Sequence, residues 1–114
     1  MTLAQLSDRA MQIRDRYADL ARQRGGKVWQ TEDVMQGFVV DVGDLMRLVM
    51  AKQGLREVPG ADEKLAHELS DCLWSILVLA RLHGVDLTAA FPSAMDELER
   101  KLSGDDSVDR VGLD

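Results

Sequence analysis

The sequence has 114 residues, of which 46% are hydrophobic and 30% are charged, and its formal net charge is −6. This length and composition predict one globular domain. The acidic balance argues against binding to nucleic acids or anionic membranes, because both attract basic surfaces. A single cysteine, Cys72, provides no disulfide framework. With no signal-peptide pattern and no membrane-length apolar run, we expect a cytoplasmic protein.

Apolar residues recur at steps of three and four over four segments, which predicts four helices and no strands. The first helix covers about residues 2 to 24, with a capping box at Thr2 and a stop at Gly25. The second is expected to begin at an N-cap residue, Thr31, and to end before a loop over residues 53 to 61.

The third helix is predicted to run from a cap at Asp62 to about His83. Asp86 or Thr88 is expected to cap the fourth, in which Pro92 is tolerated if it falls within the first turn. The fold class is therefore all-α, a four-helix arrangement.

We expect residues 1 to 103 to form the domain and residues 104 to 114, which are polar and patternless, to be a disordered tail. The main apolar stripes of the two central helices are Met35, Phe38, Val42, Leu45 and Val49, and Leu65, Leu69, Cys72, Ile76 and Leu79. From Cys72 to Leu82 the third helix is apolar nearly all round, with Trp74, Leu77 and Val78 outside its stripe. Such a helix in so short a chain predicts an oligomer.

Two pairs of acidic residues lie beside these stripes, Asp41 with Asp44 and Glu68 with Asp71. A three-residue step keeps both acids of a pair on one face of a helix, so two antiparallel helices can direct four carboxylates at one point. Buried acids without full salt-bridge partners point to a metal, and oxygen ligands suit Mg²⁺ or Mn²⁺. For either pair alone, a solvated helix face is the simpler interpretation.

In these contexts, Asp41-Val-Gly-Asp44-Leu and Glu68-Leu-Ser-Asp71-Cys-Leu-Trp, the chain resembles the MazG-like all-α nucleoside triphosphate pyrophosphohydrolases. Residues 34 to 102 carry the likeness. The family has Glu-x-x-Glu where this chain has two Asp residues, and many members have a further Glu where this chain has Val40.

The resemblance implies Mg²⁺-dependent hydrolysis of a non-canonical or surplus nucleoside triphosphate to monophosphate and pyrophosphate by a homodimer or homotetramer. Under this hypothesis Asp44, Glu68 and Asp71 are metal ligands, and Asp41 is either a fourth ligand or the general base. The metal would neutralise charge on the phosphates and activate a water for in-line attack at phosphorus. The two Asp replacements and Val40 keep an alternative open, a non-catalytic helical module that binds a nucleotide or a partner protein.

Five further residues are candidates for binding substrate. Arg100 and Lys101 match a basic cluster that the family places near the end of the fourth helix, although a solvated helix C-terminus explains them equally well. Trp29 could stack on a nucleobase or clamp the start of the second helix. Lys27, like Arg81, is a weaker candidate for contacting phosphate.

Overall fold

The computed structural model describes residues 1–105, and these residues form helices and connecting loops. In chain order the elements are α1 (Leu3–Gln23), α2 (Thr31–Lys52), α3 (Ala61–Leu82) and α4 (Leu87–Arg100), followed by a π-helical turn, η1 (Lys101–Asp105). The predicted all-α class is confirmed for this part of the chain. Most of the predicted disordered tail lies outside the described residues.

The starts of α1 and α4 agree with the sequence prediction. The Thr2 hydroxyl accepts a hydrogen bond from the Gln5 N–H at 3.1 Å, and the Gln5 side-chain oxygen accepts one from the Thr2 N–H at 2.8 Å. At α4 the Asp86 carboxylate accepts the Thr88 N–H at 3.0 Å. Pro92, however, lies beyond the first turn of α4, so the helix lacks the backbone hydrogen bond that this residue would donate.

The start of α2 differs from its prediction by one residue. Gln30 is the N-cap, and its N–H donates to the Asp33 carboxylate at 2.9 Å. Thr31 is already inside the helix, and its hydroxyl is hydrogen-bonded to His83 Nε2 at the end of α3, at 2.7 Å. The threonine therefore joins two helices and does not cap one.

The N-cap of α3 is two residues earlier than predicted. Gly60 is the N-cap, with φ of 69° in the left-handed region that favours glycine. Asp62 lies in the first turn and forms an ion pair with Lys52 at the end of α2. This pair closes the base of the loop that the sequence places between these helices.

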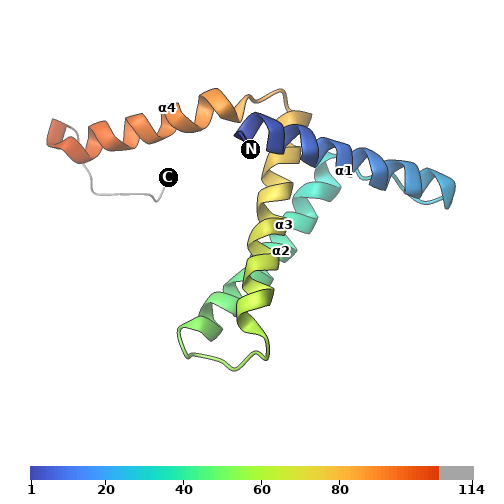
Figure 1. The fold of residues 1–114 in the computed structure, drawn as a ribbon, viewed down its shortest axis with the longest axis horizontal. Coiled ribbons are helices and arrows are strands. Elements are labelled where there is room, and N and C mark those ends of the chain that lie inside the picture. Colours follow the sequence, from blue (N-terminus) through green and yellow to red (C-terminus); the bar gives the residue numbers. More distant parts are fainter. Residues whose placement is uncertain (106–114) are drawn as a thin grey trace.

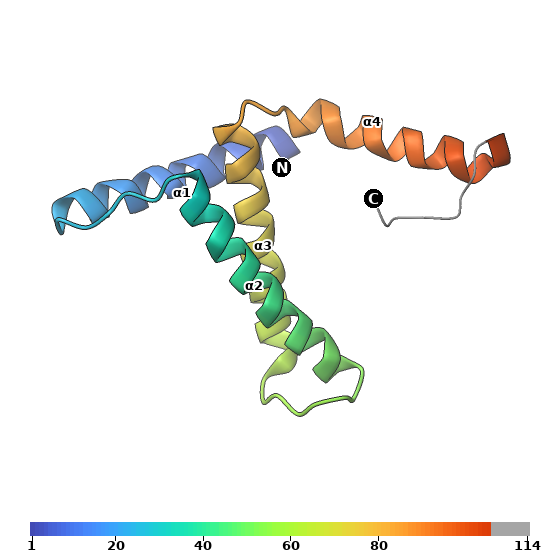
Figure 2. The ribbon, with the colours of Figure 1, turned by 180° about the vertical axis from the view of Figure 1, so that it is seen from behind.

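Helices α2 and α3 form an antiparallel hairpin, α1 crosses the upper part of α3, and α4 projects away from the hairpin (Figures 1 and 2). The radius of gyration is 17.4 Å, whereas a compact domain of this length has one of about 13 Å. No residue of α4 is buried. A single chain therefore packs three helices together and leaves the fourth largely in solvent.

The central core lies where α1, α2 and α3 meet. It is built on Ala10, Val34, Leu77 and Val78. Trp74 packs against this cluster, and its indole N–H donates to the Ala10 carbonyl at 3.2 Å. Trp74, Leu77 and Val78 are therefore covered within the single chain, whereas Leu73 and Ile76 on the same half of α3 are exposed. The predicted oligomer stays a prediction.

The predicted stripes of α2 and α3 are only partly buried. On α2 the fully buried side chains are Val34 and Leu48, whereas Met35, Val42 and Val49 of the predicted stripe are exposed. On α3 Cys72 is buried as expected, but Leu69 and Ile76 are exposed. The apolar stripes are thus wider than the contact that α2 and α3 make with each other.

Among the described residues, no helix alone has the length and apolar character to cross a membrane. The segments Ala61–Leu82 and Leu87–Gly104 meet that test only as a pair, and they are bent by 109°.

Candidate metal centre and adjoining cavity

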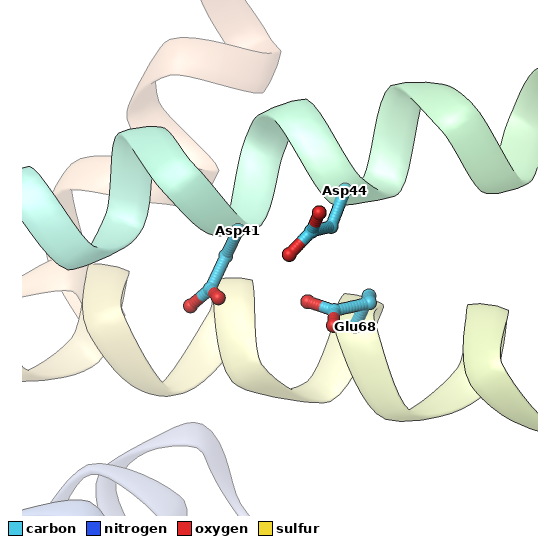
Figure 3. Close-up of side chains that lie close together, drawn as sticks. All are labelled: Asp41, Asp44 and Glu68. Atoms are coloured by element: carbon cyan, nitrogen blue, oxygen red, sulfur yellow. The ribbon is translucent and has the colours of Figure 1, made fainter.

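Three carboxylates from the two helices of the hairpin converge at one point. Asp41 and Asp44 extend from α2 towards Glu68 on α3 (Figure 3). One oxygen from each residue lies within 4.8 Å of one oxygen from each of the others. The three-residue step in α2 places both aspartates on the side that faces α3, as the sequence predicts. This arrangement is the candidate metal centre.

The three acids are half-buried and lie close enough to affect one another. Burial raises the pKa of Asp41, and the charges of Asp71 and Asp44 raise it further. Burial likewise raises the pKa of Glu68, with added effects of Asp41, Asp44 and Asp71. His67 opposes both shifts. The cluster is therefore a place where negative charge is unfavourable until a cation joins it.

Glu68 also has an unsatisfied oxygen. Its Oε2 is buried and has no hydrogen-bond partner within the described part of the chain. An unpaired buried carboxylate oxygen is costly, and a hard cation bound by three carboxylates would satisfy it. The donor set, three acidic oxygens and no nitrogen or sulfur, fits Mg²⁺ or Mn²⁺ better than zinc.

Asp71, the fourth predicted member, is not in this group of three. Its Oδ2 lies 3.2 Å from His67 Nε2 on the preceding turn of α3. Its charge nevertheless reaches the cluster, since it raises the pKa of both Asp41 and Glu68. The structure therefore brings three of the four predicted acids together and places the fourth beside them.

A cavity of about 930 Å³ opens next to the cluster, between α1 and the hairpin. Asp41 and Asp71 form part of its wall. The rest of the lining combines aromatic and basic side chains with apolar ones; the former are Tyr17, Trp29, Trp74, Arg14, Arg24 and Lys27. Anionic and cationic groups thus share one cavity, which suits a ligand that has an aromatic part and a charged part.

Trp29 is about half exposed and lies against Gly37 in α2. A Cβ at Gly37 would come within 3.0 Å of the Trp29 ring. The missing side chain at Gly37 therefore lets the indole lie close to the α2 backbone, one turn from Asp41. Trp29 lines the cavity in this position, so both predicted roles, stacking on a base and clamping the helix start, remain compatible with its contacts.

Arg14 is the main residue that sequence reasoning missed. Its side chain is 19% exposed, and one guanidinium nitrogen donates to the Trp29 carbonyl at 3.0 Å. Its Nε is buried with no acceptor among the described residues. The sequence does contain a signal, because Arg14 lies next to Ile13 and three residues before Tyr17, within the apolar repeat of the first predicted helix. A cation on an apolar stripe indicates a buried polar role.

The other predicted binding residues lie in different places. Lys27 lines the cavity, where it also pairs with Asp33 at 3.0 Å. Arg100 and Lys101 are at the far end of α4, which projects away from the cluster (Figures 1 and 2). Lys101 there pairs with Glu97 at 3.6 Å. Within one chain, the cavity and these two residues are therefore separate. Arg81 pairs with Asp8 at 2.8 Å, at the junction of α3 with α1.

No protein-family model, curated protein or solved structure matches this chain.

Proposed function

We propose that the chain is a divalent-metal-dependent pyrophosphohydrolase that cleaves a nucleoside triphosphate between its α- and β-phosphoryl groups. The observation that carries the proposal is the convergence of Asp41, Asp44 and Glu68 beside a cavity that Asp41 lines together with basic and aromatic side chains. Because acids repel a polyphosphate, such a site can hold one only with a cation between them.

The residues divide into three roles. Asp41, Asp44 and Glu68 would hold the cation, which when bound supplies charge neutralisation and an activated water. Asp71 lies beside them without belonging to the converging group, and its contact with His67 fixes its carboxylate. Asp71 is therefore the candidate to orient the attacking water and accept its proton at a carboxylate oxygen.

The substrate would be held on the α1 side of the cavity. Arg14 lines the cavity, and its guanidinium carries N–H donors for a phosphate oxygen or the edge of a base. Lys27 adds a second positive charge. The exposed half of Trp29 offers a flat apolar surface to a nucleobase. In this arrangement the phosphates point toward the acids and the base lies against α1.

The test is pyrophosphate release from a panel of ribo- and deoxynucleoside triphosphates with Mg²⁺, with Mn²⁺ or with EDTA. Wild type is compared with Glu68→Ala, and Glu63→Ala is the matched control, because Glu63 is an exposed glutamate on the same helix. We expect release that EDTA abolishes, that Glu68→Ala lowers at least about a hundredfold, and that Glu63→Ala leaves unchanged.

Two results would contradict the proposal. The first is no release from any nucleotide with either metal while circular dichroism shows a folded helical protein. Nucleotide binding without release would identify the non-catalytic module. The second is full activity in Glu68→Ala, which would place the chemistry elsewhere.

A further inference from the structure

Ser75 is a buried polar residue on the wall of the cavity. It lies on α3, it belongs to the cavity lining, and it is only 3% exposed. Among the described residues it is the one buried residue with a polar side chain. A buried hydroxyl usually has a hydrogen-bond partner, because an unpaired one costs free energy. A partner for Ser75 is therefore expected.

The described part of the chain does not supply that partner. A serine inside a helix often bonds back to the carbonyl one turn earlier, as Ser70 does with the Ala66 carbonyl at 2.8 Å. Ser75 forms no such bond. Its oxygen is not sealed off either, because the enclosed side-chain atoms without a partner among the described residues belong to Arg14 and Glu68. The free hydroxyl of Ser75 is therefore open to the cavity.

The hairpin places this hydroxyl one helical turn from the acids. Asp71 lies four residues before Ser75 on α3, which is about 6 Å along the helix axis, and both residues line the cavity. On α2, Asp41 lies near Asp71, whose charge raises the pKa of Asp41. Because the two helices are antiparallel (Figure 2), Gly37, four residues before Asp41, lies level with Ser75.

The rest of the cavity wall at this level is apolar or already hydrogen-bonded. The Trp29 ring lies against Gly37, where an added Cβ would come within 3.0 Å of it. Trp74 lines the cavity beside Ser75, but its indole N–H already donates to the Ala10 carbonyl at 3.2 Å. A polar group of a ligand that reaches this level therefore finds its hydrogen-bond partner in the Ser75 hydroxyl.

In a nucleoside triphosphate the part at this distance from the phosphates is the sugar. The sugar ring is joined to the α-phosphate through one oxygen and one methylene carbon, and the base is attached on the far side of the ring. With the phosphates beside the acids and the base against Trp29, the sugar lies level with Ser75. A serine hydroxyl both donates and accepts, as a sugar hydroxyl does, so the two groups match.

We propose that Ser75 is a specificity-determining residue that hydrogen-bonds a hydroxyl of the substrate's sugar. The identity of the ligand rests on the proposed function, and the free buried hydroxyl does not. The bond satisfies a group that the protein alone leaves without a partner. Alanine at this position would leave the sugar hydroxyl unpaired in a partly enclosed site, which lowers affinity only for ligands that have this hydroxyl.

The test combines changes in the protein with changes in the ligand, and it measures binding by isothermal titration calorimetry with Mg²⁺. The ligands are four non-hydrolysable triphosphate analogues that share one base and contain ribose, 2′-deoxyribose, 3′-deoxyribose or 2′,3′-dideoxyribose. We expect Ser75→Ala to weaken binding of the ribose analogue about fivefold or more and that of the dideoxyribose analogue less than twofold. The single-deoxy analogue that behaves like the dideoxyribose one identifies the hydroxyl.

Ser70→Ala is the matched control, because Ser70 is an exposed serine of α3 whose hydroxyl bonds within its own helix. It should leave all four affinities unchanged. Without ligand, Ser75→Ala should unfold at the same urea concentration as wild type, because its hydroxyl has no partner to lose. A clearly lower urea midpoint for Ser75→Ala would show that the hydroxyl serves the fold, and it would overturn the inference.

The remaining outcomes separate this inference from the proposed function. An equal loss of affinity for all four analogues, or no loss for any, overturns the inference alone. A loss that depends on the sugar, in a protein that releases no pyrophosphate, supports the role of Ser75 and contradicts the hydrolase. If wild type binds none of the analogues, both the inference and the proposed function are wrong.

Discussion

The two sides of the α2–α3 hairpin have opposite chemistry. The side toward α1 has three converging carboxylates and a cavity with Arg14 and Trp29 on its wall. Elsewhere the two helices carry exposed aliphatic side chains, among them Met46 of α2 and Leu73 of α3. Polar groups are thus gathered where a ligand can satisfy them, and apolar groups are gathered where a protein surface can cover them. The same two helices therefore present converging carboxylates on one side and exposed aliphatic side chains on the other.

The largest expected effect concerns the core between the two sides. Leu48 is only 1% exposed, so Leu48→Ala removes packing that the surroundings cannot replace. We expect the free energy of unfolding to fall by about 3 kcal/mol in urea titrations. Leu55→Ala, in the exposed loop, should change it by less than about 0.5 kcal/mol. Equal effects of the two changes would mean that α2 and α3 are not packed through Leu48.

The next effect tests the cavity side. Arg14→Met keeps most of the length of the side chain and removes its donors. We expect KM for the nucleotide to rise about tenfold or more, since a hydrogen bond to a charged group contributes about 1.5–3 kcal/mol, and kcat to change less. Arg9→Met on the exposed surface of α1 is the control. A KM that stays within twofold of wild type would remove Arg14 from the binding site.

The acid cluster also predicts a dependence of stability on pH. The pKa of Glu68 is raised in the folded protein, so its contribution to stability is present below the pKa of the unfolded chain, about 4, and is lost as the pH rises through the folded value. Without metal, Glu68→Gln should therefore gain stability relative to wild type between about pH 4 and pH 7. Thermal melts in EDTA measure this difference.

Metal provides the control for that experiment. Saturating Mg²⁺ or Mn²⁺ binds the ionised cluster and should raise the melting temperature of wild type at pH 7 by more than that of Glu68→Gln. If the difference in melting temperature between wild type and Glu68→Gln does not vary with pH, then the pKa of Glu68 is not raised by folding as described.

The smallest effects compare two glycines of α2. Gly37→Ala brings a methyl group against the Trp29 ring, so it should shift Trp29 fluorescence and weaken nucleotide binding severalfold. Gly43→Ala meets nothing in its own chain and should leave nucleotide binding unchanged. Because alanine has the better helix propensity, Gly43→Ala should raise the free energy of unfolding by up to about 1 kcal/mol in urea titrations. Weaker nucleotide binding in Gly43→Ala, with no effect of Gly37→Ala, would contradict the role given to the contact between Gly37 and Trp29.

Much of this arrangement follows from local sequence. The capping residues Thr2 and Asp86 identify helix starts, and a three-residue step is enough to predict that Asp41 and Asp44 share a face. The predicted cap of α2 lies one residue too late and that of α3 two residues too late, because Thr31 and Asp62 form contacts with distant residues, His83 and Lys52. The preference of a residue type for the N-cap position does not show whether its side chain instead contacts a residue far away in the sequence.

The burial of the stripes could not be predicted for a related reason. Apolar periodicity shows the average direction of all apolar side chains on a helix and does not separate buried from exposed ones. The predicted stripe of α2 therefore lies between the direction of Leu48, which is buried, and that of Met46, which is exposed. The separation of Asp71 from the converging acids accompanies its contact with His67 on the same helix. The place of Arg14 on the cavity wall depends on how α1 crosses the hairpin. That crossing is determined by core contacts such as Trp74 with Ala10, which have no signature in local spacing.

The most direct test of whether the three converging carboxylates bind a metal is a titration with Mn²⁺ monitored by electron paramagnetic resonance. The titration is made with and without a non-hydrolysable nucleoside triphosphate analogue. Wild type should bind Mn²⁺, the analogue should tighten that binding, and Asp44→Asn and Glu68→Gln should each weaken it at least tenfold, whereas Glu63→Gln should not. If wild type binds no Mn²⁺ in either condition, or if the cluster variants bind it as wild type does, the three converging carboxylates are not a metal centre.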